Sequence, residues 1–445
     1  MSELRKLLFV VAVFPTLREA RRVGQPHSIM SRSRELLFFV ALLMASVASV
    51  QGQELVLLGG EIYPSPTADA IKNRLVLVDH GKIEAITERS KFKLKLPPDA
   101  RIIDCTGKVI VAGFWNSHVH FTEDAWDDAV HAPAAKLEAH MQEMLTRWGF
   151  TTVFDIASNP ENTLSLRKRV ESGEVPGPKI YTTAGEIYPE NGIPVYLPEK
   201  IARQLTSQEA ATPEDAARLA RREMELGGDG VKLFAGAIKE HSKVIPMPVE
   251  VIRAAVEVAH AAGKPVFAHP SNHVGTDNAL AGGVDILAHA IPMEKDWTPE
   301  ELQRMKQQHT ALIPTLSLFV DEERRTGGTE EDKRVVLERA VRELKEFFDQ
   351  GGPVLFGTDV GYTQLYDTTS EYEYMARAGM SWRDILASLT TNPNAFFKAA
   401  NTGRVEKGMD ADLVVLEGDP AVDVRNFAKV AWTVRKGKVI YSVKQ

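Results

Sequence analysis

Histidine and aspartate side chains recur in this 445-residue sequence where short apolar segments end. His118 and His120 are two positions apart, and on an extended strand such side chains point to the same side, so both imidazoles can reach one cation. His269, His289 and Asp359 end three later segments. Imidazole and carboxylate groups are ligands of divalent cations such as zinc. Because the chain has 12 histidines, the first pair alone could arise by chance, and the pattern carries weight only if the segment ends meet.

Lys232 lies inside another apolar segment, Gly-Val-Lys-Leu-Phe at residues 230–234. A buried lysine is costly unless it has a partner. One interpretation is an ammonium group paired with a carboxylate. The other is an uncharged lysine that has reacted with carbon dioxide, because the resulting carbamate can bridge two cations. From the residue alone, the first interpretation is favoured.

The elements that must position these residues alternate along residues 106–400. Helix-length segments with capping signals, such as those beginning at Thr212, Thr298 and Ser381, separate short apolar strands. The predicted strands are 109–112, 151–156, 179–183, 230–234, 265–269, 285–289, 311–315 and 353–358. This alternation favours an α/β fold, a (β/α)8 TIM-like barrel, in which the strand ends converge on one mouth. An open doubly wound sheet is the rival, but no G-x-G-x-x-G motif follows the first strand.

Both ends of the chain read as β-structure. Strand-like segments with turn residues between them occur at 55–58, 74–79 and 82–86, and again at 412–416, 429–435 and 438–442. We therefore predict that residues 53–105 and 401–445 form one small β-sandwich domain, which is interrupted by the barrel at 106–400.

Composition narrows the class of protein. Lys and Arg number 53 against 60 Asp and Glu, so the net charge of −7 argues against nucleic-acid binding. The single cysteine, Cys105, excludes an internal disulfide and a cysteine-rich zinc site. Any metal must therefore be held by His, Asp, Glu or a modified Lys.

The first 52 residues read as a leader. An uncharged apolar run at 36–50 follows Met30 and two arginines, Arg32 and Arg34. It is short for a membrane span and typical of a signal peptide, with Met30 as the expected true start. We expect a periplasmic or secreted protein with no stable membrane span after removal of the signal. The alternative is an uncleaved anchor.

With these residues in place, the sequence resembles the metal-dependent amidohydrolase superfamily, in its imidazolonepropionase-like and prolidase-like branch. The resemblance covers essentially all of 53–445. It rests on Val-Ala-Gly-Phe-Trp-Asn-Ser-His-Val-His at 111–120, where Asn116 replaces a frequent Asp, and on Gly-Thr-Asp-Val-Gly at 357–361. The segment 281–289 and the closing segment 403–416 are also similar.

The resemblance implies a centre with two divalent metal ions, of which zinc is the expected one. His118 and His120 would bind the more buried ion, and His269 and His289 the more exposed one. Lys232, N-carboxylated, would bridge them, which reverses the preference drawn from that residue alone.

The resemblance also implies hydrolysis of an amide or peptide bond by a metal-activated hydroxide. Asp359 would contact the buried cation and act as the catalytic proton carrier. Deaminases of the superfamily and imidazolonepropionases carry Glu three positions after the strand-five histidine, where this chain has Asn272, and this difference argues against both activities. The resemblance to this family also suggests that the protein forms a homo-oligomer.

Substrate contacts are expected from loops after the strands. Glu186, Tyr188, His273 and Tyr362 are the candidates, with simple loop packing as an equal alternative for them. The substrate would be a small-molecule amide or peptide, with dipeptides and N-acyl amino acids among the options. Alternative functions are a lactonase or esterase, a mononuclear hydrolase with unmodified Lys232 and, last, a non-catalytic binding protein.

Overall fold

The computed structural model describes residues 55–88, 100–195, 197, 205–240, 243–294 and 296–443. The leader at 1–52 and the predicted signal segment lie outside the described residues. Within the described part of the chain, no helix combines the length and the apolar character needed to cross a membrane. The fold is α/β, with most helices located between strands in the central part of the chain.

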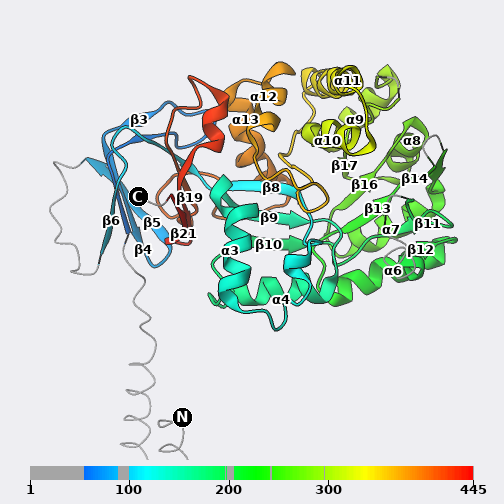
Figure 1. Cartoon of the computed structure of the whole chain (residues 1–445), viewed down its shortest axis with the longest axis horizontal. Helices are drawn as coiled ribbons and strands as arrows, with labels where there is room; N and C mark the ends of the chain where they lie inside the picture. The colour runs from blue at the N-terminus through cyan, green and yellow to red at the C-terminus, as the bar shows by residue number, and fades with distance from the viewer. Residues whose placement is uncertain are drawn as a thin grey trace, which may run out of the picture. The chain divides into compact units, whose positions relative to one another are not determined.

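The two ends of the described chain form two sheets, of which the first uses N-terminal strands alone and the second combines strands from both ends (Figure 1). The first, in the order β5-β4-β1-β6, contains β1 (Leu55–Leu58), β4 (Arg74–Asp79), β5 (Lys82–Glu88) and β6 (Arg101–Asp104). The second, in the order β21-β20-β19-β7-β2-β3, contains β2 (Glu61–Ile62), β3 (Ile71–Lys72), β7 (Val109–Ala112), β19 (Leu413–Leu416), β20 (Val430–Arg435) and β21 (Lys438–Ser442). One apolar cluster includes residues of both sheets, among them Leu57, Val76, Ile110 and Val415.

The prediction that 109–112 is the first barrel strand is wrong. These residues form β7, which pairs with β19 and β2 in the second terminal sheet. After Gly113 the chain enters a new strand, β8 (Phe114–Val119), which contains the first histidine. A side chain at Gly113 would collide with Thr151, whose Oγ1 would lie 2.2 Å from an added Cβ. This glycine therefore permits the close approach of the β7–β8 junction to the neighbouring strand.

The central strands form two parallel sheets. One has the order β10-β9-β8, with β9 (Phe150–Asp155) and β10 (Lys179–Thr182) beside β8. The other has the order β13-β16-β17-β18, made of β13 (Val231–Phe234), β16 (Val266–His269), β17 (Ile286–Ala288) and β18 (Ala311–Ile313). Apart from β10, where Lys179 is exposed, the residues of these strands are almost completely buried, as expected for parallel strands covered on both faces.

The segment 353–360 connects the outer strands of these two sheets. The Leu312 amide of β18 donates to the Pro353 carbonyl, and the Ser117 amide of β8 donates to the Phe356 carbonyl. The predicted strand at 353–358 is not regular, since single bridges at Val354 and Val360 replace a continuous ladder. On the other side, the Asp229 amide before β13 donates to the Thr182 carbonyl of β10 at 2.6 Å.

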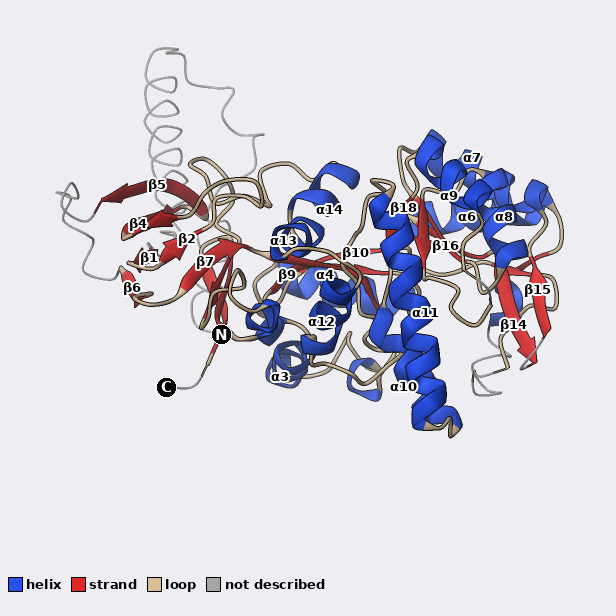
Figure 2. Cartoon of the chain, turned by 90° about the horizontal axis from the view of Figure 1, so that it is seen from above, coloured by secondary structure: helices blue, strands red, loops and turns tan. Residues whose placement is uncertain are grey.

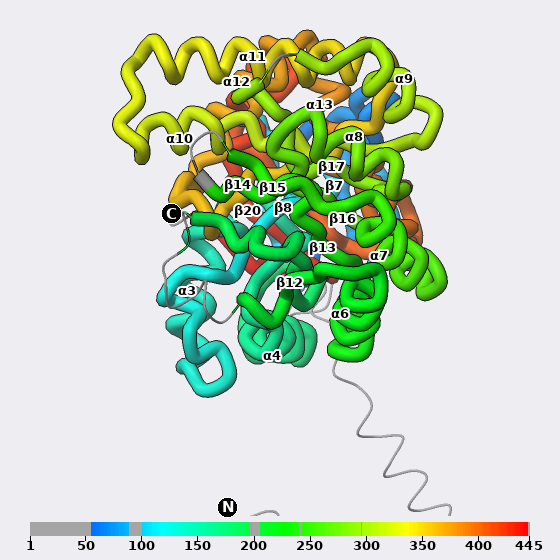
Figure 3. The backbone as a smooth tube through the Cα atoms, turned by 90° about the vertical axis from the view of Figure 1, so that its right-hand side faces the viewer, coloured from blue at the N-terminus to red at the C-terminus, as the bar shows by residue number. Residues whose placement is uncertain are grey.

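Helices cover the central strands. Figure 1 shows α4 below β8, β9 and β10, α3 beside β9 and β10, and α12 and α13 above them. Figure 3 shows β8, β13, β16 and β17 with helices around them. The α-helices are α3 (Ala134–Met144), α4 (Pro160–Glu171), α6 (Pro213–Leu226), α7 (Val249–Ala261), α8 (His273–Gly282), α9 (Pro299–Gln308), α10 (Leu316–Thr326), α11 (Glu330–Asp349), α12 (Thr369–Arg377), α13 (Trp382–Leu389) and α14 (Thr391–Phe396). The predicted caps are confirmed: Thr212, Thr298 and Ser381 each accept a hydrogen bond from the backbone amide three residues later.

Several short elements complete the description. The hairpin of β14 (Gly236–Glu240) and β15 (Lys243–Pro246) was not predicted, and Figure 2 shows it at the end of the molecule opposite to β4, β5 and β6. A second short pair joins β11 (Tyr188–Pro189) to β12 (Glu209–Ala210). The 3-10 helices are η3 (Asp124–Trp126), η4 (Thr146–Trp148), η5 (Thr206–Gln208) and η6 (Val424–Ala428).

Candidate metal centre

Three predicted ligand atoms converge at the end of β8. Asp359 Oδ1 lies 2.8 Å from His120 Nε2 and 3.1 Å from His118 Nε2, and the two Nε2 atoms lie 3.2 Å apart. A four-coordinate zinc ion with bonds of about 2.0–2.1 Å holds its ligand atoms about 3.3 Å from one another. The spacing of these three atoms is therefore close to that of ligands around a single cation.

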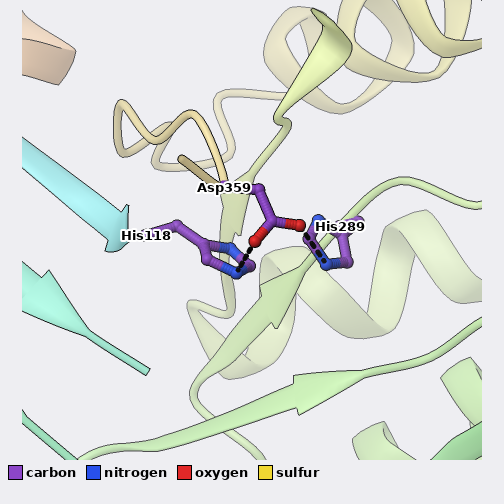
Figure 4. A group of neighbouring side chains, drawn as sticks. All are labelled: His118, His289 and Asp359. Atoms are coloured by element: carbon purple, nitrogen blue, oxygen red, sulfur yellow. Dashed lines mark ion pairs between the residues drawn. The ribbon is translucent and has the colours of Figure 1, made fainter. Parts of the chain in front are cut away.

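His289 approaches the same aspartate from the other side (Figure 4). Its Nε2 lies 3.7 Å from Asp359 Oδ2, and its ring stacks on that of His118 with centroids 4.7 Å apart. One ligand atom from each of His118, His289 and Asp359 lies within 4.8 Å of the others. His269 follows, with its ring centroid 4.9 Å from that of His289. Four imidazoles and one carboxylate, distant in sequence, thus lie together.

Local backbone geometry explains the position of Asp359. The residue has a φ of 60°, in the left-handed region, and its amide donates to the His118 carbonyl at 2.9 Å. Gly361 has a φ of 102°, and an added Cβ would lie 1.9 Å from the His120 carbonyl oxygen. An added Cβ at Gly357 would lie 2.8 Å from His118 Cβ. The glycines on both sides of Asp359 let this segment lie directly against β8.

Lys232 lies on β13 with 2 % of its surface exposed, and it lines the same cavity as the histidines. Burial lowers the pKa of its ammonium group to about 8, although the carboxylates of Asp359 and Glu186 act in the opposite direction. No described carboxylate is close enough to form an ion pair with it. The buried lysine therefore loses its proton more readily than an exposed lysine does.

Burial also controls the protonation of the histidines. It lowers the pKa of His118 to about 4 and that of His269 to about 3, and it holds the pKa of His289 well below its usual value. For His120, burial is outweighed by the Asp359 carboxylate beside its Nε2, which raises the pKa. Three imidazoles are thus neutral near pH 7, which is the form that binds metal ions.

Two histidines are oriented through their second ring nitrogen. His120 Nδ1 donates to the Ala157 carbonyl at 2.8 Å, and a hydrogen bond of 2.6 Å joins His289 Nδ1 to Thr315 Oγ1. Such outer partners fix the ring and the tautomer of a metal-binding histidine. Sequence reasoning missed Thr315, which ends a predicted strand but carries no ligand-type side chain.

A cavity of about 790 Å³ opens beside these residues. Glu186, Tyr188 and Tyr362, three of the four predicted substrate contacts, line it, and the Tyr188 hydroxyl donates to Glu186 Oε1 at 2.7 Å. His273 is not among the lining residues. It begins α8, and its Nδ1 lies 2.9 Å from Glu301 Oε1.

Glu322 is a further lining residue, contributed by α10, that the sequence did not reveal. Its carboxylate accepts a hydrogen bond from the Tyr362 hydroxyl at 3.2 Å. A single glutamate in a charged helix has no pattern that distinguishes it from a solvent-facing residue. Asn272, by contrast, has a visible local role, because its side chain accepts from the Gly275 amide at 2.8 Å and caps α8.

Comparisons with known proteins identify relatives of this chain. The profile of the amidohydrolase family matches residues 109–440. An imidazolonepropionase of Thermoplasma acidophilum is 22 % identical over 83 % of this chain and 90 % of its own. An ochratoxinase of Aspergillus niger is 23 % identical over 72 % of each chain. The solved structure of a Xaa-Pro dipeptidase with bound methionine in its active site superposes with a TM-score of 0.74 at 20 % identity, over 88 % of this chain and all of the other.

Proposed function

This chain belongs to the amidohydrolase family and is a metal-dependent hydrolase of carbon–nitrogen bonds, and we propose that its reaction takes place in the cavity beside Asp359. The observation that carries the proposal is the triangle of His118 Nε2, His120 Nε2 and Asp359 Oδ1, with sides of 2.8–3.2 Å. The proposed substrates are small amides or peptides.

The residues fit a pair of divalent cations. We propose that His118, His120 and Asp359 hold one ion and His269 and His289 the other, with zinc as the metal. Asp359 Oδ1 is buried and makes no hydrogen bond of good geometry to a described residue, as expected for an atom whose partner is a cation. Bound here, the cations would supply Lewis acidity, which lowers the pKa of a water molecule and polarises the scissile carbonyl.

Asp359 is the proposed proton carrier. Burial would raise the pKa of its carboxyl group, but the close imidazoles of His118 and His120 hold the pKa well below its usual value. The group is therefore ionised near pH 7, which is the form that can accept a proton from the attacking water and deliver it to the leaving nitrogen. Oδ1 of Asp359 faces His118 and His120, whereas Oδ2 faces His289. One oxygen can therefore accept the proton while the other stays beside its imidazole.

The test is the variant Asp359→Asn in the full-length protein. We expect bound zinc to remain largely intact while kcat/KM for the best amide substrate falls by about 10²-fold or more, because the amide cannot carry the proton. Elemental analysis measures the metal, and profiling with dipeptides, N-acyl amino acids and lactones identifies the substrate. Asp367→Asn, on the same loop, is the matched control, because its exposed carboxylate accepts from the Thr369 amide and does not line the cavity. Wild-type turnover by metal-loaded Asp359→Asn would refute the role.

We further propose that Lys232 is N-carboxylated. Its buried position in the cavity supports this, because the uncharged Nζ can attack carbon dioxide and lose a proton to give a carbamate. The anionic oxygens would then face the cluster of imidazoles. Native mass spectrometry should show one carboxyl adduct in the wild type and none in Lys232→Arg, which should also bind less metal. An unmodified Lys232 in a fully metal-loaded protein would contradict the carbamate.

Four larger features belong to the same proposal. We propose that β8, β9, β10, β13, β16, β17, β18 and the segment 353–360 close into a (β/α)8 barrel, a closure supported by the hydrogen bonds of 353–360 to β18 and β8. The apolar cluster common to the two terminal sheets supports a β-sandwich formed by both chain ends, separate from the barrel.

The apolar run at 36–50 supports export to the periplasm or the medium. A homo-oligomer is also proposed, and analytical ultracentrifugation would test it.

A further inference from the structure

Glu322 introduces a carboxylate into an otherwise apolar part of the cavity wall. Leu318 and Phe319 precede it by four and three residues on α10, so they lie on the same helix face, and all three residues line the cavity that contains Asp359. The Tyr362 hydroxyl donates to Glu322 Oε1 at 3.2 Å, and the Tyr362 amide donates to the Asp359 carbonyl at 3.2 Å. One tyrosine therefore connects Glu322 to the backbone of the catalytic aspartate.

Two arginines lie near Glu322 on α10 and pair with another carboxylate, and Arg325 Cζ also lies 4.5 Å from the centroid of the Tyr362 ring. Arg324 pairs with Asp321, and Arg325 Nε lies 3.1 Å from the second oxygen of Asp321. Within the described part of the chain, no Lys, Arg or His forms an ion pair with Glu322. Burial, reinforced by the charge of Asp359, raises the pKa of the Glu322 carboxyl group to about 7, although the hydrogen bond from Tyr362 and the charge of Arg325 act in the opposite direction. The net effect is that the carboxylate form of Glu322 is destabilised in this wall.

A cationic group on a bound substrate would stabilise the Glu322 carboxylate. An ammonium or guanidinium group beside Glu322 would form a partly desolvated, charge-assisted hydrogen bond. The methylene stem of a basic side chain would lie along Leu318 and Phe319, because long cationic side chains place their stems on apolar surface. The reacting amide would then lie toward Asp359 in the same cavity.

We propose that Glu322 is a specificity residue that selects substrates with a cationic group, such as amides and dipeptides with a basic side chain. The inference rests on the proposed hydrolysis of amides in this cavity and names its preferred substrate class. Asp359 and the histidines perform the reaction on any amide that fits, whereas Glu322 determines which amides bind well.

Matched dipeptides test this preference in the full-length, metal-loaded protein. Norleucine has the shape of lysine without its ammonium group, so Phe-Lys is compared with Phe-norleucine, and Lys-Phe with norleucine-Phe. In at least one pair, the wild type should show a kcat/KM at least about tenfold higher for the lysine peptide, which corresponds to about 1.4 kcal/mol. Glu322→Gln should reduce that ratio to near one through loss of activity on the lysine peptide alone.

Glu323→Gln is the matched control, since it removes the same charge from the next position of α10, which does not line the cavity. It should leave the ratio unchanged. A readout without turnover is inhibition by n-hexylamine compared with n-hexanol, where the advantage of the amine should disappear in Glu322→Gln.

The outcomes separate the two proposals. If the wild type hydrolyses no dipeptide or other amide, the proposed function in this cavity fails. If it hydrolyses both members of each pair equally, or if the lysine preference persists in Glu322→Gln, the specificity role is overturned while the hydrolase stands. Equal loss of both peptides in a folded, metal-loaded Glu322→Gln protein would make Glu322 a catalytic residue and would also overturn the inference.

Discussion

At the scale of single residues, His289 shows how a predicted ligand depends on a neighbour that was not predicted. Its Nε2 faces Asp359 Oδ2, while Nδ1 shares a 2.6 Å hydrogen bond with Thr315 Oγ1. Thr315 has a φ of 45°, an uncommon conformation for a β-branched residue. The Glu371 carboxylate stabilises the backbone after Thr315, because it accepts hydrogen bonds from the Leu316 and Ser317 amides.

Thr315→Val should therefore weaken metal binding without removing a ligand. Valine has the same shape but cannot bond to Nδ1, so the ring loses its orientation, and we expect zinc affinity to fall by about 10- to 100-fold. Competition with a chromogenic chelator measures the dissociation constant. Thr315→Ser keeps the hydroxyl and should retain most of the affinity, and Thr326→Val, at the exposed end of α10, should have no effect. Equal affinities of Thr315→Val and wild type would exclude the orienting role.

At the scale of elements, α11 supports the loop after β17 through a buried glutamate. Glu343 Oε2 accepts from the Ile291 amide at 2.7 Å, two residues after His289. Burial raises the pKa of the Glu343 carboxyl group to about 9, although the bond to Ile291 acts against this. The folded protein therefore keeps a proton that the unfolded chain releases above its usual pKa near 4.5.

This difference in the protonation of Glu343 predicts how the free energy of unfolding changes with pH. Between about pH 5 and pH 9 the folded state binds more protons at Glu343 than the unfolded state, so stability decreases as pH rises, by up to about 1.4 kcal/mol per pH unit. Glu343→Gln keeps an acceptor for Ile291 and should flatten this part of the curve. Urea unfolding at several pH values measures it, with Glu338→Gln on the exposed face of α11 as the control. Parallel curves for wild type and Glu343→Gln would show that Glu343 titrates normally.

At the scale of the whole molecule, the proposed ligands join distant parts of the chain. His118 lies on β8, His269 ends β16, and Asp359 lies in the segment that connects β18 with β8. Cations held by these residues bind the folded state and not the extended chain, and such ligands stabilise folding by mass action.

Metal removal should consequently destabilise the whole described fold. Dialysis against a chelator is expected to lower the thermal midpoint on the order of 5 °C, and zinc should restore it. Differential scanning fluorimetry measures the shift. His118→Ala should respond much less to the chelator, because one proposed ligand is already absent. An identical midpoint with and without metal in the wild type would argue that no ion is bound tightly.

The sequence by itself determined the features that depend on local chemistry. The strand predictions for β4, β9, β10, β13, β16 and β18 hold to within two residues at either end, because apolar runs bounded by turn residues need no distant information. The caps at Thr212, Thr298 and Ser381 follow from adjacent residues alone. The predicted ligand types were visible because strand-end imidazoles and carboxylates are unusual in apolar surroundings.

Only the tertiary structure decided which partners these elements and side chains meet. Val109–Ala112 has the composition of a central strand, yet pairing with β19, about 300 residues later, places it in a terminal sheet. Thr315 and Glu322 became recognisable only when folding brought one to His289 and the other into the cavity of Asp359. Local propensity cannot specify such contacts, because they arise from the packing of segments whose separation along the chain carries no periodic signal.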